Sequence, residues 1–142
     1  RQQVAGYQAE MGHVSLRLGS WWEALPDQLR GHVDLVVSNP PYVSLAEWPT
    51  LDPSVREHEP RGALVADPGS GGEPGLKEVE RVLDGAATWL ARPGTAVIEI
   101  APRQESAAAC AARRRGAAWT RVMVDLAGRP RTLVARWRRP SR

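Results

Sequence analysis

The chain has 142 residues, of which 42% are hydrophobic and 25% are charged, and its formal net charge is +3. This balance suits one folded domain, residues 1–142, and excludes a disordered polyelectrolyte. No apolar run approaches the roughly 20 residues that a membrane-spanning helix needs, and the single cysteine, Cys110, excludes a disulfide within the chain. The opening residues lack the charged-then-apolar pattern of a signal peptide, so we expect a cytoplasmic protein.

Positive charge is concentrated in the last thirty residues. Residues 113–142 contain ten arginines and one acidic residue, whereas residues 1–112 carry a net negative charge. A basic end can steer a protein toward nucleic acid. A solvated arginine-rich surface is the more ordinary interpretation of such a run, so direct nucleic-acid binding is possible but not favoured.

Two strands are the first elements that the sequence predicts. Residues 14–18 alternate apolar and polar side chains, which is typical of a half-buried strand. Residues 33–37 form a nearly continuous apolar run rich in β-branched residues, which predicts a central parallel strand covered on both faces. Pro40 and Pro41 end that strand abruptly, and residues 43–75, with five prolines, are expected to form loops.

Helices and strands alternate in the second half of the chain. Helical spacing of apolar residues predicts a helix over 75–90, followed by a turn at 92–94 and a buried strand over 95–100. An alanine-rich helix is expected over 104–115, then strands over 119–126 and 132–137. The short connector between these two strands requires an antiparallel pair. The order predicts an α/β fold: a mostly parallel sheet with helices on its faces and an antiparallel hairpin at its end.

A four-residue motif, Asn39, Pro40, Pro41 and Tyr42, follows the predicted central strand directly. Ligands of open α/β sheets bind beyond the carboxyl ends of the strands, so the motif is in the right place for a site. The prolines stiffen the backbone, and the Asn39 side-chain oxygen and the Pro40 carbonyl could accept both hydrogens of a substrate NH2 group. Tyr42 offers an aromatic face to a planar amide or base. The competing interpretation is a Pro-Pro turn preceded by a capping asparagine.

The motif and its surroundings resemble the HemK-type release-factor glutamine methyltransferases. The resemblance rests on the Asn-Pro-Pro-Tyr motif together with four further segments: residues 19–21, residues 55–64, the pair Glu99 and Gln104, and residues 125–131. It implies a Rossmann-like class I fold that uses S-adenosylmethionine, of which this chain is the C-terminal part. It also implies that Trp21 and Asn39 contact the cofactor, and that residues 39–42 bind the substrate and serve catalysis.

The chain departs from the family pattern at Ala101, where the family usually has glycine. The Gly-rich cofactor loop, the acidic ribose partner and a helical recognition domain are expected upstream of the segments seen here. Residues 63–72 imitate a strand with a Gly-rich loop, but Pro68 interrupts them, so a surface loop is the better interpretation. Residues 57–59 are poorly spaced for a metal, and we expect no metal site.

Three functions remain open at this point. The resemblance favours methylation of a glutamine side-chain amide, with a peptide-chain release factor as the protein partner. A nucleic-acid amino-methyltransferase acting on adenine N6 or guanine N2 would use the same four residues, and the basic end favours it slightly. A truncated, non-catalytic fragment is the third possibility.

Overall fold

The computed structural model describes residues 14–139. Four strands form one sheet: β1 (Val33–Ser38), β2 (Leu90–Glu99), β3 (Trp119–Val124) and β4 (Pro130–Trp137). The helices are α2 (Pro53–His58), α3 (Arg61–Leu64), α4 (Lys77–Trp89) and α5 (Glu105–Arg114). Five 3-10 turns complete the set: η1 (Trp21–Ala24), η2 (Asp27–Leu29), η3 (Trp48–Thr50), η4 (Ser70–Gly72) and η5 (Pro102–Gln104).

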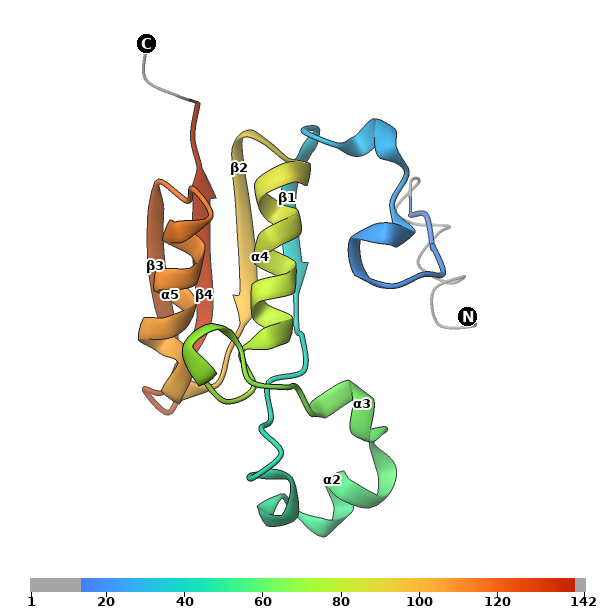
Figure 1. Cartoon of the computed structure of the whole chain (residues 1–142), viewed down its shortest axis with the longest axis vertical. Coiled ribbons are helices and arrows are strands. Elements are labelled where there is room, and N and C mark those ends of the chain that lie inside the picture. Colours follow the sequence, from blue (N-terminus) through green and yellow to red (C-terminus); the bar gives the residue numbers. More distant parts are fainter. Residues whose placement is uncertain (1–13, 140–142) are drawn as a thin grey trace.

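The sheet is mixed, with the strand order β1-β2-β4-β3. β1 and β2 are parallel, and β4 pairs antiparallel with both β2 and β3. The parallel pair requires a crossover, which residues 39–89, including helix α4, provide. By contrast, β3 and β4 are joined by a tight hairpin loop (Figure 1). The prediction of an α/β fold that ends in an antiparallel hairpin is confirmed.

Helices α4 and α5 lie side by side on one face of the sheet (Figure 1). Beneath them, alternate residues of β2 and β4 point into a fully buried core, with Ile98 paired to Leu133 and Ala96 paired to Ala135. Val79, Leu83 and Ala86 supply the apolar stripe of α4, and small alanines let α5 approach the sheet closely. Within residues 14–139, no helix covers the opposite face, so the expected covering of both faces is wrong for this part of the chain.

Two strand predictions need correction. Residues 14–18 form no strand, and Leu18 is fully exposed, because an alternating pattern gives a strand only where the backbone joins the ladder of a sheet, and the described sheet contains only β1 to β4. β1 forms as predicted but pairs on one side only, with β2, and its residues Leu35 and Val37 are 55% and 71% exposed. β1 is therefore an edge strand of the described sheet, not a central strand covered on both faces.

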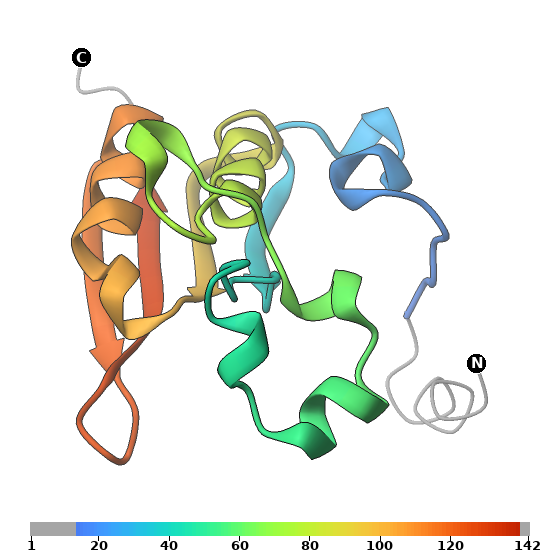
Figure 2. The same cartoon turned by 60° about the horizontal axis from the view of Figure 1, so that its bottom comes forward.

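The predicted loop over 43–75 contains several short helices. Helix α2 begins at Pro53 behind an Asp52 N-cap, whose carboxylate accepts a hydrogen bond from Ser54 N at 2.8 Å. Together with α3, this segment projects away from the sheet in both views (Figures 1 and 2). The turn expected at 92–94 is absorbed into β2 as an irregularity in its pairing with β1. No helix among residues 14–139 has the length and apolar character to cross a membrane.

Candidate functional site

The Asn-Pro-Pro-Tyr motif begins at the residue after β1, beyond its carboxyl end. Pro40 is buried, whereas Asn39 is exposed. The Asn39 side chain forms no hydrogen bond with any residue in the 14–139 range. Its amide is therefore available to a ligand, while the proline that follows it is fixed by packing.

The backbone after the motif is attached to the segment that follows α3. The amides of Tyr42 and Val43 both donate to the Leu64 carbonyl, at 3.1 and 2.9 Å, and Val43 in turn accepts from the Ala66 amide at 2.9 Å. Val43 and Val65 form an isolated parallel bridge. Leu64, the last residue of the segment 55–64 that carries part of the family resemblance, thus helps to hold the end of the motif.

A second attachment holds the Tyr42 carbonyl. Arg103 Nη2 donates to this oxygen at 3.0 Å, and Arg103 Nη1 forms an ion pair with Glu47 Oε1 at 2.7 Å. Gly75 packs so closely against the same carbonyl that a Cβ atom there would overlap it, and its φ of +67° also favours glycine. Neither Arg103 nor Gly75 could be predicted from the sequence as part of the site, because nothing local to either residue indicates contact with Tyr42.

The Tyr42 side chain is held by charged groups. Its hydroxyl donates to Glu99 Oε1 at 2.9 Å and accepts from Arg131 Nη1 at 3.4 Å. The Arg131 guanidinium also lies over the ring, 6.0 Å from its centroid. Burial raises the pKa of the Tyr42 hydroxyl, and the neighbouring Glu99 carboxylate raises that pKa further. Tyr42 is therefore a protonated hydrogen-bond donor at neutral pH.

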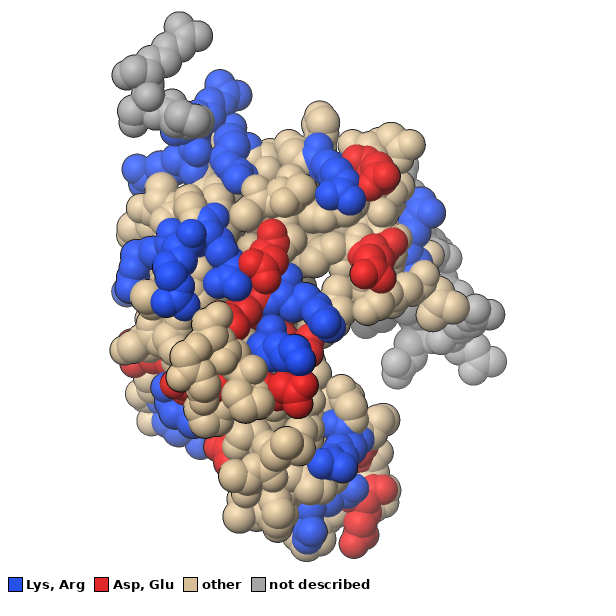
Figure 3. All heavy atoms as spheres, viewed as in Figure 1, with Lys and Arg blue, Asp and Glu red and all other residues tan. Residues whose placement is uncertain are grey.

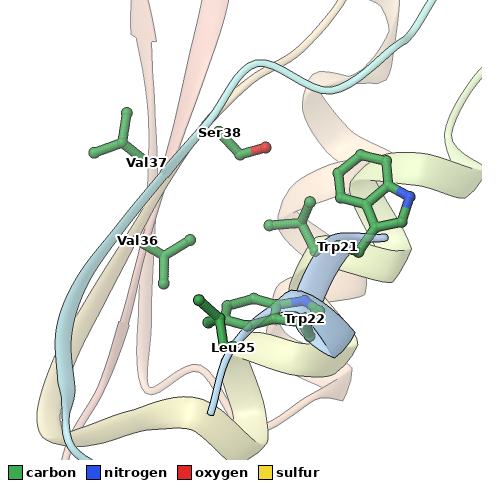
Figure 4. A pocket seen from close by; sticks show the side chains of 7 residues that line it. Trp21, Trp22, Leu25, Val36, Val37 and Ser38 are labelled. Carbon is green, nitrogen blue, oxygen red and sulfur yellow. The ribbon is translucent and has the colours of Figure 1, made fainter. Parts of the chain in front are cut away.

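An apolar pocket of about 190 Å³ lies beside the end of β1 (Figure 4). Val36 and Ser38 point from β1 toward Trp21 and Trp22, whereas Val37 points to the other side of the strand. Trp22 is seated on α4: it stacks on Trp89 with 6.0 Å between ring centroids, and its Nε1 donates to the Arg81 carbonyl at 3.2 Å. Trp21 lines the pocket wall, and the Arg81 guanidinium lies over its ring, 6.0 Å from the centroid.

The lining of this pocket suits one end of an adenosyl group. The aromatic and aliphatic side chains that line the pocket fit a flat base. Ser38, which also lines the pocket, is the residue directly before Asn39. The lining contains no acidic side chain that could bind a ribose. The residues present therefore fit the base of such a cofactor and leave its ribose without a partner.

Asn39 borders two further hollows. One, of about 180 Å³, is lined by Asn39 and Glu99 together with Val37, Ser38, Val97 and Thr132. The other, of about 70 Å³, lies between the motif and residues 63–64. The first hollow shares Val37 and Ser38 with the Trp21 pocket, so both hollows border the end of β1, and Asn39 follows directly in the chain.

Two other sequence signals concern residues outside the motif: the glycine-rich segment and the residues considered as metal ligands. The glycine-rich residues 69–72 form a surface turn, and Ser70 N donates to Glu80 Oε2 at 2.8 Å, so the turn is tied to α4. It does not follow a sheet strand, which supports its interpretation as a loop. Among residues 14–139, no cluster of three or more histidine, cysteine or carboxylate side chains is suited to a metal ion.

A sheet that ends in an antiparallel hairpin and carries an Asn-Pro-Pro-Tyr loop beyond a parallel strand agrees with the Rossmann-like methyltransferase fold that the resemblance implies. No protein-family model matches the chain. Its sequence is 42% identical over 129 residues to the release factor glutamine methyltransferase of Streptomyces coelicolor, covering 89% of this chain and 43% of that protein. The corresponding protein of Cereibacter sphaeroides is 37% identical over 123 residues, covering 87% of this chain and 41% of its own length.

The same description applies to a protein of Prochlorococcus marinus, 43% identical over 90 residues, or 63% of this chain and 29% of that protein. The chain is thus a relative of the release factor glutamine methyltransferases and matches their C-terminal part, spanning less than half of their length. A solved structure described provisionally as a DNA modification methylase of Thermus thermophilus has a TM-score of 0.45 and 18% identity, over 84% of this chain and 51% of its own. This likeness is too weak to support an argument.

Proposed function

We propose that this chain carries the substrate-binding part of an S-adenosylmethionine-dependent methyltransferase that methylates a glutamine side-chain amide in a peptide-chain release factor. The observation that carries the proposal is the Asn39 amide. It is unpaired among the described residues and stands at the end of β1, on a loop whose last residue is anchored at its amide, its carbonyl and its hydroxyl. The names of the relatives support the choice of substrate.

The chemistry required of the protein is orientation. An amide nitrogen is a poor nucleophile because its lone pair is delocalised into the carbonyl. Asn39 Oδ1 and the Pro40 carbonyl would accept the two hydrogens of the substrate NH2 group and direct the nitrogen toward the reacting carbon. S-adenosylmethionine supplies an electrophilic methyl group when bound, and Trp21 would pack against its adenine. Because a release factor acts on the ribosome, we infer that the reaction takes place in the cytoplasm.

A second candidate is methylation of a base amino group in nucleic acid. Figure 3 shows basic side chains gathered on the α5 and β4 side of the molecule. Several of them are already engaged: Arg115 contacts Asp84, Arg129 pairs with Asp125, and Arg136 lies over the Trp119 ring. Charge steers encounter more than it selects the reacting group, so this surface favours the second candidate less than the relatives favour the first.

The deciding experiment uses a hybrid methyltransferase in which this chain replaces the matching region of the Streptomyces coelicolor relative. The hybrid is incubated with radiolabelled S-adenosylmethionine and, in separate reactions, release factor, ribosomal RNA or DNA. We expect label in the release factor, in a peptide that contains glutamine. Label in nucleic acid but never in protein would establish the second candidate. No label from a folded hybrid, beside an active unmodified relative, would indicate a non-catalytic chain.

A further inference from the structure

Three segments that are far apart in the sequence meet at the Tyr42 hydroxyl. This group donates to Glu99 Oε1 at 2.9 Å and accepts from Arg131 Nη1 at 3.4 Å, and the same Arg131 nitrogen lies 3.9 Å from Glu99 Oε1. Glu99 and Arg131 follow Tyr42 by 57 and 89 residues. We call Tyr42, Glu99 and Arg131 the hydroxyl clamp.

The two charged members of the clamp are themselves fixed by the sheet. Glu99 is the last residue of β2 and is paired with Thr132 of β4. Next to this pair, Ile100 N donates to the Arg131 carbonyl at 2.9 Å. The backbones that carry Glu99 and Arg131 are therefore joined at the end of the β2–β4 pair, where Arg131 lies at an irregularity in the pairing of β4 with β3.

The hairpin loop supports the Arg131 guanidinium. Asp125 Oδ2 lies 3.9 Å from Arg131 Nε, and Asp125 Oδ1 accepts from the amides of Ala127 and Arg129 at 2.9 and 3.0 Å. The Arg129 backbone N–H, with the other donors of the loop, holds the pKa of Asp125 below its usual range. Asp125 is therefore a fixed negative charge behind Arg131.

The backbone between Tyr42 and Asn39 is rigid. Pro40 and Pro41 separate Tyr42 from Asn39, and their fixed φ angles leave the backbone little freedom between the two. A change in the position of the Tyr42 ring should therefore reach Asn39. Asn39 and Glu99 line the same hollow, so the clamp stands at the border of the region where we place the substrate amide.

We propose that Glu99 and Arg131 are positioning residues: they hold the Tyr42 hydroxyl and, through it, set the direction of the Asn39 side-chain amide. Their importance for methyl transfer rests on the function proposed above. Their effect on Asn39 does not, and it can be measured without any reaction.

Asn39 is the only asparagine of the chain, so selective ¹⁵N-asparagine labelling gives one side-chain NH2 signal and one backbone signal. We expect Tyr42→Phe, Glu99→Gln and Arg131→Met each to shift or broaden these signals in the 142-residue chain. Arg121→Met is the matched control, since Arg121 is exposed and forms no contact with the motif, and it should leave them unchanged. Circular dichroism verifies that each variant is folded. Asn39 signals that ignore all three clamp substitutions would overturn the proposal.

A double-mutant cycle in the hybrid methyltransferase tests the effect on the reaction. Glu99→Ala should lower kcat by about 10- to 100-fold and change KM by less than about twofold, because a displaced group mainly costs alignment. Tyr42→Phe should lower kcat in the same way, and the double variant should be no worse than the poorer single variant. Arg121→Met, at an exposed residue outside the clamp, is again the control. Fully additive effects would show that Glu99 does not act through Tyr42 and would overturn the proposal.

The two proposals fail in different ways. A hybrid that labels nucleic acid instead of release factor overturns the proposed substrate, and the cycle is then measured on that nucleic acid. A hybrid that methylates glutamine, but whose Asn39 signals and kcat are unchanged by substitutions in the clamp, overturns only the proposal that Glu99 and Arg131 position Asn39.

Discussion

Asn39 is the residue on which the proposed chemistry depends. Asn39→Ala removes the side-chain acceptor, and because that exposed side chain forms no hydrogen bond with any other described residue, the fold should be unaffected. We expect kcat/KM of the hybrid methyltransferase to fall by about 10²- to 10³-fold, the range seen when one oriented polar group is lost from an active site. A filter-binding assay of methyl transfer provides the measurement.

Asn39→Asp is the companion variant. It keeps an acceptor but adds a charge and removes the NH2 donor, so an equal loss of activity would show that orientation needs the neutral amide. If Asn39→Ala retained most of the activity at an unchanged melting temperature, Asn39 would not bind the substrate amide.

Tyr42 predicts a particular dependence of stability on alkaline pH. Its pKa is raised in the folded state, so the folded protein holds the hydroxyl proton more tightly than the unfolded chain does. The stabilisation is complete below the unfolded pKa of about 10 and is lost as the pH rises through the folded value. Below that range, wild type should exceed Tyr42→Phe by about 0.5–1.5 kcal/mol in the free energy of unfolding.

Urea unfolding at a series of pH values from about 8 to 11 measures this difference. All other residues are common to the two proteins, so their contributions cancel in the comparison. A difference that stayed constant across the series would mean that the Tyr42 hydroxyl is not held as the structure indicates.

At the scale of the elements, the position of η1 depends on a glycine of α4. A Cβ atom at Gly85 would overlap the Trp22 indole, which also donates to the Arg81 carbonyl. Gly85→Ala should gain about 1 kcal/mol of helix propensity, yet lose about 1–3 kcal/mol by displacing the indole. We therefore expect no gain in stability, and an altered tryptophan fluorescence spectrum. Gly62→Ala in α3 meets open space and should be neutral or slightly stabilising.

Elements with a local signal could be predicted from the sequence. β1, α4, α5 and the β3–β4 hairpin each carry a repeating apolar pattern, and each forms close to its predicted bounds. Residues 14–18 carry such a pattern too, but a strand also needs a partner, and no local pattern supplies one. The short helices within 43–75 depend on caps and on contacts with the motif, so their prolines were the stronger signal for loops.

The candidate site also has a part that the sequence predicts and a part that it does not. Its four-residue core was visible because the residues are consecutive, whereas the contacts of Tyr42 with Glu99, Arg103 and Arg131 span 57 to 89 residues. The available signal was indirect: Glu99 and Arg131 both belong to segments that carry the family resemblance, and such segments can meet in space.

Over the whole molecule, the described pockets predict weak cofactor binding by the chain alone. The Trp21 pocket offers a wall for adenine, but its lining has no acidic partner for a ribose. Calorimetry with S-adenosylmethionine should show a dissociation constant no tighter than about 1 mM, or about −4 kcal/mol. The Streptomyces coelicolor relative is the positive control. Tight binding with a stoichiometry of one would mean that a second binding element lies within these 142 residues.

The open edge of β1 predicts self-association of the chain. Among residues 14–139, the edge of β1 away from β2 pairs with no strand, so its backbone groups are able to pair with another strand edge, and Leu35 and Val37 on this strand are exposed. Sedimentation velocity of the 142-residue chain should give a coefficient that rises with concentration, and Val37→Lys should suppress this rise. A wild-type coefficient that is independent of concentration would count against the prediction.

The distance in sequence between Tyr42 and Arg131 also sets an order of events during synthesis. At roughly 5–20 residues per second, a ribosome needs about 4–18 seconds to proceed from one to the other. Throughout that interval the Asn-Pro-Pro-Tyr loop exists on the nascent chain without its clamp. If Glu99 and Arg131 position the motif as we propose, the loop reaches its final geometry only after the hairpin has left the exit tunnel. A chain that ends before Arg131 would then carry the motif without the arginine that holds Tyr42.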